Sequence, residues 1–179
     1  MFDYKTISLF DQPLFTWMST STPAQGEVEI NSEACLAYIV EGQDQFLIKE
    51  ENIKATKGQF IASLCGYTMS HMLSNYREQE GFMSTVVVHF HKDILKRIYE
   101  GEKPPAWEEL KRPVSKYVVQ QAANELITQY FVGITHLFKN QEALSEEILV
   151  LKLKEIILLL LQTKNADHLI QMIRSLFST

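Results

Sequence analysis

The pattern of apolar and polar positions changes once along the chain, from short runs to helical spacing. The first half contains short apolar runs with glycine or polar turns between them: Leu14–Met18, Cys35–Val40, Gln45–Ile48, Asn52–Thr56, Gln59–Leu64, Met69–Leu73 and Phe82–Phe90. Short strands with turns at this spacing are typical of an antiparallel sandwich or small barrel. No helical pattern interrupts them, which disfavours a parallel α/β sheet.

The second half follows the helical period. Its pattern predicts three helices, at Val114–Phe131, Glu142–Gln162 and Asp167–Phe177. The segment Leu151–Leu161 is apolar almost all round, so it must be buried on more than one side by the barrel, another helix or another subunit. We therefore expect a homodimer in which this helix meets its copy in antiparallel orientation. Leu151, Lys154 and Leu158 share one stripe of the helix and are the candidate contact residues.

Charge and composition exclude several classes of protein. The 179 residues are 46% hydrophobic and 22% charged, as in ordinary globular proteins, and their net charge of -5 disfavours unaided DNA binding. Two cysteines without a C-x-x-C pair favour a reducing compartment. The N-terminus lacks a signal-peptide pattern, and the apolar run Ile156–Leu161 is too short to cross a bilayer. We therefore expect a cytoplasmic protein with no membrane contact.

Four segments carry a resemblance to a known family. Leu36–Gln43 and Lys57–Gly66 each combine a strand with a glycine turn, Thr85–Phe90 is a strand followed by Ile94-Leu95, and Leu151–Leu161 is the apolar helix. In order and spacing, they resemble the N-terminal cupin-like regulatory domain of AraC/XylS-type bacterial transcription regulators.

That resemblance implies an α+β fold, with an antiparallel cupin-like β-barrel of the jelly-roll type at 1–92 and a helical dimerisation subdomain at 93–179. It implies effector sensing, by a small molecule or a protein, together with dimerisation. Proteins of this family continue into two helix-turn-helix units, so we expect a DNA-binding domain after residue 179 and contact with DNA only through it.

Residues for catalysis or metal binding do not form a convincing set. Many cupins hold a metal with a His-x-His pair and a glutamate on one strand, but the region before Gly42 has no histidine. His89 and His91 do form such a pair, but they lie on the strand that matches the barrel's end, with Lys92 beside them, and a solvated strand end is the favoured interpretation. Cys65, near His71, lacks a nucleophile elbow and an orienting acid. We expect no catalytic residue, no metal and no cofactor.

The barrel interior is the remaining candidate site, because small barrels enclose packed side chains or one small ligand. Aromatic and imidazole groups that could stack on an effector or hydrogen-bond to it are Trp17, Tyr38, His71 and Tyr76. The same groups could simply fill the core. Two other functions stay open: a stand-alone cupin-like binding protein and a small metal-dependent cupin enzyme.

Overall fold

The computed structural model describes residues 2–20, 26–28, 32–48, 51–64, 69–71, 83–105 and 116–177. All strand pairs are antiparallel, and the strands form two sheets. The larger sheet contains, in spatial order, β1 (Phe2–Leu9), β2 (Gln12–Thr20), β9 (Met83–Phe90), β4 (Ala34–Glu41), β7 (Gln59–Leu64) and β10 (Val118–Ala122). The smaller sheet contains β3 (Gly26–Val28), β8 (Met69–His71), β5 (Gln43–Ile48) and β6 (Glu51–Thr56).

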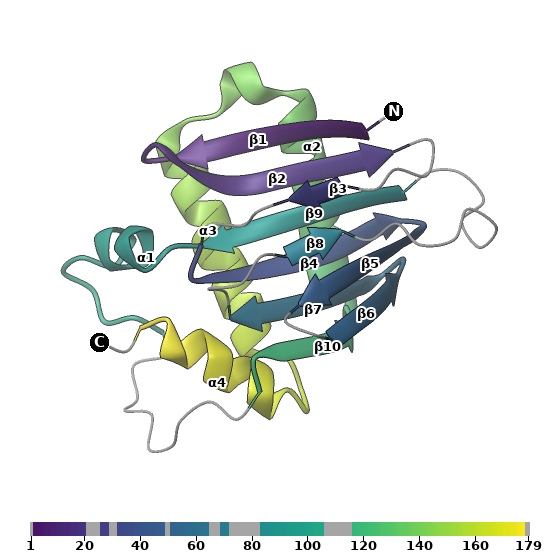
Figure 1. Cartoon of the computed structure of the whole chain (residues 1–179). Coiled ribbons are helices and arrows are strands. Elements are labelled where there is room, and N and C mark those ends of the chain that lie inside the picture. The colour runs from purple at the N-terminus through teal and green to yellow at the C-terminus, as the bar shows by residue number, and fades with distance from the viewer. Residues whose placement is uncertain are drawn as a thin grey trace.

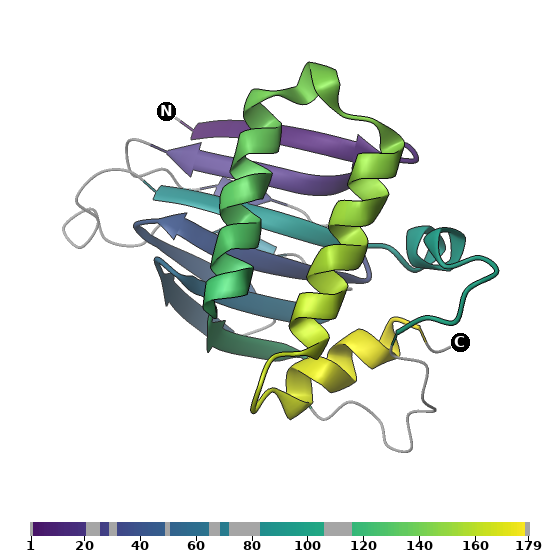
Figure 2. The ribbon, with the colours of Figure 1, turned by 180° about the vertical axis from the view of Figure 1, so that it is seen from behind.

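The helices complete a three-layer arrangement. They are α1 (Lys92–Ile98), α2 (Glu125–Lys139), a 3₁₀ turn at Gln141–Ala143, α3 (Glu146–Leu161) and α4 (Asp167–Ser175). The smaller sheet lies in front of the larger one (Figure 1), whereas α2 and α3 run side by side across the opposite face (Figure 2). This is the expected α+β class. Among the described strands, the two sheets remain separate and do not close into one continuous barrel.

Two apolar cores fill the two gaps between layers. On β4, Leu36 and Tyr38 belong to the core between the larger sheet and the helices, while Ala37 and Ile39 belong to the core between the two sheets. This alternation follows from the two-residue period of a strand. Because β4 and β9 are covered on both faces, all eight residues of β9 are buried.

The predicted helix at Val114–Phe131 is wrong in its first part. Val118–Ala122 forms β10, which pairs with β7, and the helix α2 begins only at Glu125. The Asn124 side chain accepts a hydrogen bond of 2.9 Å from the Ile127 amide and fixes the start of the helix. Pairing with an open strand edge thus prevails over the local helical spacing. The division at residue 92 therefore does not separate strands from helices, because β10 belongs to the larger sheet.

The first strand, β1, has no counterpart among the predicted strands. It joins β2 through the two-residue turn Phe10-Asp11, where both residues have positive φ, 51° and 64°. Two-residue hairpin turns of this kind favour Asn-Gly or Asp-Gly. The pair Phe-Asp does not carry that signal.

Candidate effector site and dimerisation surface

Trp17 and Tyr38 lie on the helix-covered face of the larger sheet rather than in the barrel interior. The Tyr38 ring stacks on Phe131 of α2, with centroids 4.4 Å apart and planes 2° from parallel. The Trp17 ring lies 5.6 Å from Phe138, and its Nε1 donates a hydrogen bond of 2.6 Å to Ser84 Oγ. These two rings therefore join β2 and β4 to α2, and effector binding by them stays a prediction.

The other two predicted effector residues cannot be placed. The side chain of His71 and the whole of Tyr76 lie outside the described part of the chain. The backbone of His71 ends β8, where it pairs with Gly26 and Phe46.

The space between the two sheets is filled by side chains from both of them. The fully or almost fully buried members of this core are Met18, Cys35, Ala37, Ile39, Phe46, Ile48, Ala55, Ile61 and Val87. The buried Asp44 carboxylate enters the same space and accepts a hydrogen bond of 2.9 Å from Thr85 Oγ1. The described interior therefore has the character of a packed core.

A small apolar pocket lies elsewhere, between α4 and the larger sheet. Its cavity volume is about 10 Å³, room for one water molecule. Its lining comes from β4, β7, β9, α3, α4 and Leu176, with Ala62 and Phe90 on the sheet side and Leu160 and Met172 on the helix side. A cavity of this size cannot hold an organic effector.

Two buried histidines lie near the C-terminal end of β9, His89 within the strand and His91 directly after it, and both contact β2. His89 Nε2 and Thr16 Oγ1 are hydrogen-bonded at 2.7 Å. Burial, with the charge of His91 as a second cause, lowers the pKa of His89 to about 4. His89 is therefore neutral at physiological pH, which suits an imidazole held between two sheets.

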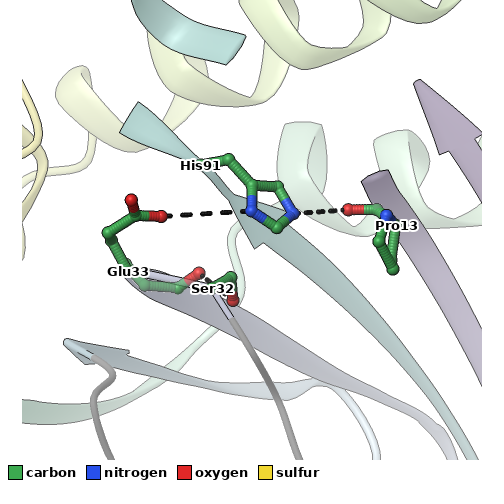
Figure 3. A network of polar contacts seen from close by, with 5 residues as sticks. Pro13, Ser32, Glu33 and His91 are labelled. Carbon is green, nitrogen blue, oxygen red and sulfur yellow. Dashed lines mark hydrogen bonds and ion pairs between the residues drawn. The ribbon is translucent and has the colours of Figure 1, made fainter. Parts of the chain in front are cut away.

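The His91 side chain contacts two segments that lie far from it in the sequence (Figure 3). Its Nε2 lies 2.8 Å from the carbonyl oxygen of Pro13 in β2, and its Nδ1 lies 3.9 Å from Glu33 Oε2, just before β4. The neighbouring Ser32 donates a hydrogen bond of 3.0 Å to the Ala34 carbonyl. Sequence reasoning weighed His89 and His91 as metal ligands against a solvated strand end, and the solvated strand end is wrong because both side chains are buried. Among the described residues, no group of three or more His, Cys, Asp or Glu side chains could hold a metal ion.

The predicted dimerisation residues fall into two groups. Leu151 and Leu158 are 65% and 45% exposed on the outer side of α3. Lys154, in contrast, turns toward the end of α1: its Nζ lies 3.3 Å from Glu102 Oε2 and 5.0 Å from the centre of the Tyr99 ring.

Further exposed apolar side chains accompany Leu151 and Leu158, and sequence reasoning did not single them out. We call the exposed apolar residues of the two helices that lie side by side the outer apolar surface: Leu126, Val132, Ile148, Leu151 and Leu158. Ile148 stands three residues before Leu151, on the same stripe of α3. That spacing was a signal that could have found it.

No helix in the described residues is long and apolar enough to span a membrane.

Inside the helix layer, Tyr130 holds α2 and α3 together. Its hydroxyl donates a hydrogen bond of 2.7 Å to the Lys152 carbonyl. Burial, with Glu155 as a second cause, raises the pKa of Tyr130 well above its ordinary value. The hydroxyl therefore stays protonated and keeps its donor role.

Comparison with solved structures finds the same fold. The apo form of a ToxT variant from Vibrio cholerae strain SCE256 is similar over 86% of this chain and 57% of the ToxT chain, with a TM-score of 0.53 and 9% identity. Unsaturated fatty acid bound wild-type ToxT from the same strain matches with a TM-score of 0.47 and 11% identity, over 80% of this chain and 52% of that one. A cupin superfamily protein from Desulfitobacterium hafniense matches with a TM-score of 0.41 and 10% identity, over 51% of this chain and 78% of that one. This chain thus spans about half the length of ToxT.

Sequence comparison identifies the family. No curated protein sequence matches the chain significantly. The profile of the ExsA N-terminal regulatory domain, however, matches residues 34–172, which is most of the chain and runs from the start of β4 into α4. The resemblance to AraC-type regulators is thereby confirmed: the chain is an effector-sensing regulatory domain and belongs to the ExsA N-terminal regulatory domain family.

Proposed function

We propose that this domain is the dimerising and sensing half of a bacterial AraC-type transcription regulator that contacts DNA through a further domain. We infer the dimer from the outer apolar surface on α2 and α3. Exposed apolar patches of this kind mark interaction sites, and an apolar face repeated on a second copy buries itself in an isologous dimer. Leu151 and Leu158, the most exposed residues of its α3 stripe, are the proposed centre.

A cellular reporter tests this role with the whole chain. Residues 1–179 are fused to a DNA-binding domain that represses its operator only as a dimer. The wild-type fusion should repress the reporter, and Leu151→Glu with Leu158→Glu should abolish repression. Lys139→Glu, an exposed charge change at the end of α2, should leave repression intact. Equal repression by the double variant and wild type would contradict the proposal.

The effector is proposed to be a protein partner. The support is the packed core between the two sheets, where the described side chains fill the interior, together with the small volume of the pocket beside α4. Native mass spectrometry of the full chain, purified from cells without denaturation, should show the mass of two polypeptides with no additional bound mass. A small organic molecule retained at one equivalent, and released on denaturation, would favour a small-molecule effector.

The proposal assigns the domain no reaction and no resident cofactor, because its role is to pass a signal to a DNA-binding domain. It also places the protein in the cytoplasm, where such a regulator meets DNA. A stand-alone cupin-like protein would share the fold but would not need the exposed leucines of α3.

A further inference from the structure

The short helix α1 contacts elements on both sides of it. The guanidinium carbon of Arg97 lies 3.6 Å from the centre of the Phe10 ring, at the tip of the β1–β2 hairpin. Just after this same C-terminal end of α1, the Tyr99 ring and Glu102 both approach Lys154 of α3. Phe10 is part of the larger sheet's hairpin and Lys154 is part of the helix layer, so α1 and the residues just after it connect the sheet to the helix layer.

His91 stands immediately before the first residue of this bridge. Its side chain is only 6% exposed, and each of its ring nitrogens faces an oxygen (Figure 3). A carbonyl oxygen can only accept, so Nε2 carries a hydrogen and donates to Pro13. Nδ1 therefore carries a second hydrogen only when the ring is cationic. Facing the Glu33 carboxylate at 3.9 Å, a bare Nδ1 presents a lone pair to a negative charge, whereas a protonated Nδ1 forms an ion pair.

We propose that His91 is a protonation-dependent clasp: when its ring is cationic it ties the start of β4 to β2 and to the start of α1, and through α1 it stiffens the contact with α3. The start of β4, the strand β2 and the start of α1 are then linked through one charged side chain. When the ring is neutral, the link to β2 remains and the link to Glu33 is lost.

Most of the charged groups around His91 are exposed to water. The titratable or charged groups on the elements that meet at His91 are Glu33 before β4, His89 on β9, Asp11 in the β1–β2 turn, and Lys92 and Asp93 in the first turn of α1. The strand β2 contains no charged residue. Asp11, Lys92 and Asp93 are exposed, so water screens them. Burial, with His91 as a second cause, lowers the pKa of His89 to about 4, so His89 is neutral above that pH.

Urea unfolding of the full chain at pH 5.5 and pH 8.0, at one fixed protein concentration, tests the clasp. Glu33→Gln removes the carboxylate charge and keeps the volume. Because Glu33 is 45% exposed, the expected loss in urea midpoint is on the order of 0.3 M at pH 5.5 and less than half of that at pH 8.0.

The control is Glu41→Gln. Glu41 is 47% exposed and pairs with Lys57 at 2.7 Å. A lysine does not titrate between these two pH values, so the loss in this variant should be equal at both. A Glu33→Gln loss that is also equal at both pH values would overturn the clasp.

Amide ¹H–¹⁵N spectra between pH 5.5 and 8.0 test the link to α3. In the wild type, the amides of Leu95, Tyr99 and Lys154 should shift with a common midpoint, and His91→Gln should remove that shift. His136→Gln, at an exposed histidine of α2, should leave it unchanged. If His91→Gln does not fold, Glu33→Gln serves instead and should reduce the amplitude at Lys154. A Lys154 response that persists at full amplitude in either variant would contradict the bridge.

Discussion

The buried imidazole of His89 should make the fold lose stability as the pH falls from about 6.5 towards 4. Its pKa is lowered from 6.5 to about 4 in the folded chain, mainly by burial. Between these values the unfolded chain binds a proton that the folded chain does not, so acidification favours unfolding. At pH 5 this proton uptake costs about 2 kcal/mol of unfolding free energy, and above pH 7 it costs almost nothing.

The variant that removes this effect is His89→Gln. A glutamine retains a group that can hydrogen-bond to Thr16 Oγ1 but cannot take up the proton. Because the substitution changes packing as well, the quantity to compare is the difference in unfolding free energy between pH 7 and pH 5, measured by urea denaturation. That difference should be smaller by about 2 kcal/mol in His89→Gln than in the wild type.

The matched control is His136→Gln, on the exposed face near the end of α2. It removes an imidazole at an exposed position, so the pH dependence of stability should stay that of the wild type. If His89→Gln kept the full pH dependence of the wild type, the buried, neutral state of His89 would be refuted.

Two further substitutions test the helix layer. Tyr130→Phe should cost about 1 kcal/mol of unfolding free energy, because the Lys152 carbonyl loses its buried donor, whereas Tyr4→Phe, at a 48% exposed ring, should cost almost nothing; thermal denaturation of both variants measures this. Asn124→Ala should cost about 1 kcal/mol by removing the cap of α2, and Asn124→Asp should keep most of it; an alanine variant as stable as the wild type would show that the cap is not formed in solution.

Hydrophobic spacing was enough to predict most strands and the last two helices. The predicted runs correspond to β2, β4, β5, β6, β7, β8 and β9, since each is short and bounded by glycine or polar turns. The helix α3 begins after Ser145, whose side chain accepts a hydrogen bond from the Ile148 amide, and α4 begins at the predicted Asp167. These elements are specified by local signals that the sequence displays.

The orientation of side chains on the strands was not predictable in the same way. Residues on β4 are buried on both faces, so its pattern has no polar side that distinguishes the helix layer from the other sheet. Trp17 and Tyr38 lie on the face of the sheet that α2 covers, where they contact the rings of Phe138 and Phe131. That pairing joins residues far apart in the chain and leaves no mark in local spacing.

The predicted dimerisation residues of α3 also show what local spacing cannot predict. Helical spacing placed Leu151, Lys154 and Leu158 together. The structure keeps the two leucines on the outer face, but it directs Lys154 to Glu102, which comes 52 residues earlier. A contact across that sequence separation depends on where α1 ends, which the pattern of α3 cannot show.

Sedimentation equilibrium of the full chain at micromolar concentration tests the central proposal, a regulatory domain that dimerises through α2 and α3. The wild type and Lys139→Glu should both sediment at twice the chain mass. The double variant with Leu151→Glu and Leu158→Glu should sediment at the mass of one chain and keep the wild-type circular dichroism spectrum, because both side chains are exposed within the protomer. A wild type that sediments as a monomer, or a double variant that remains a dimer, would contradict it.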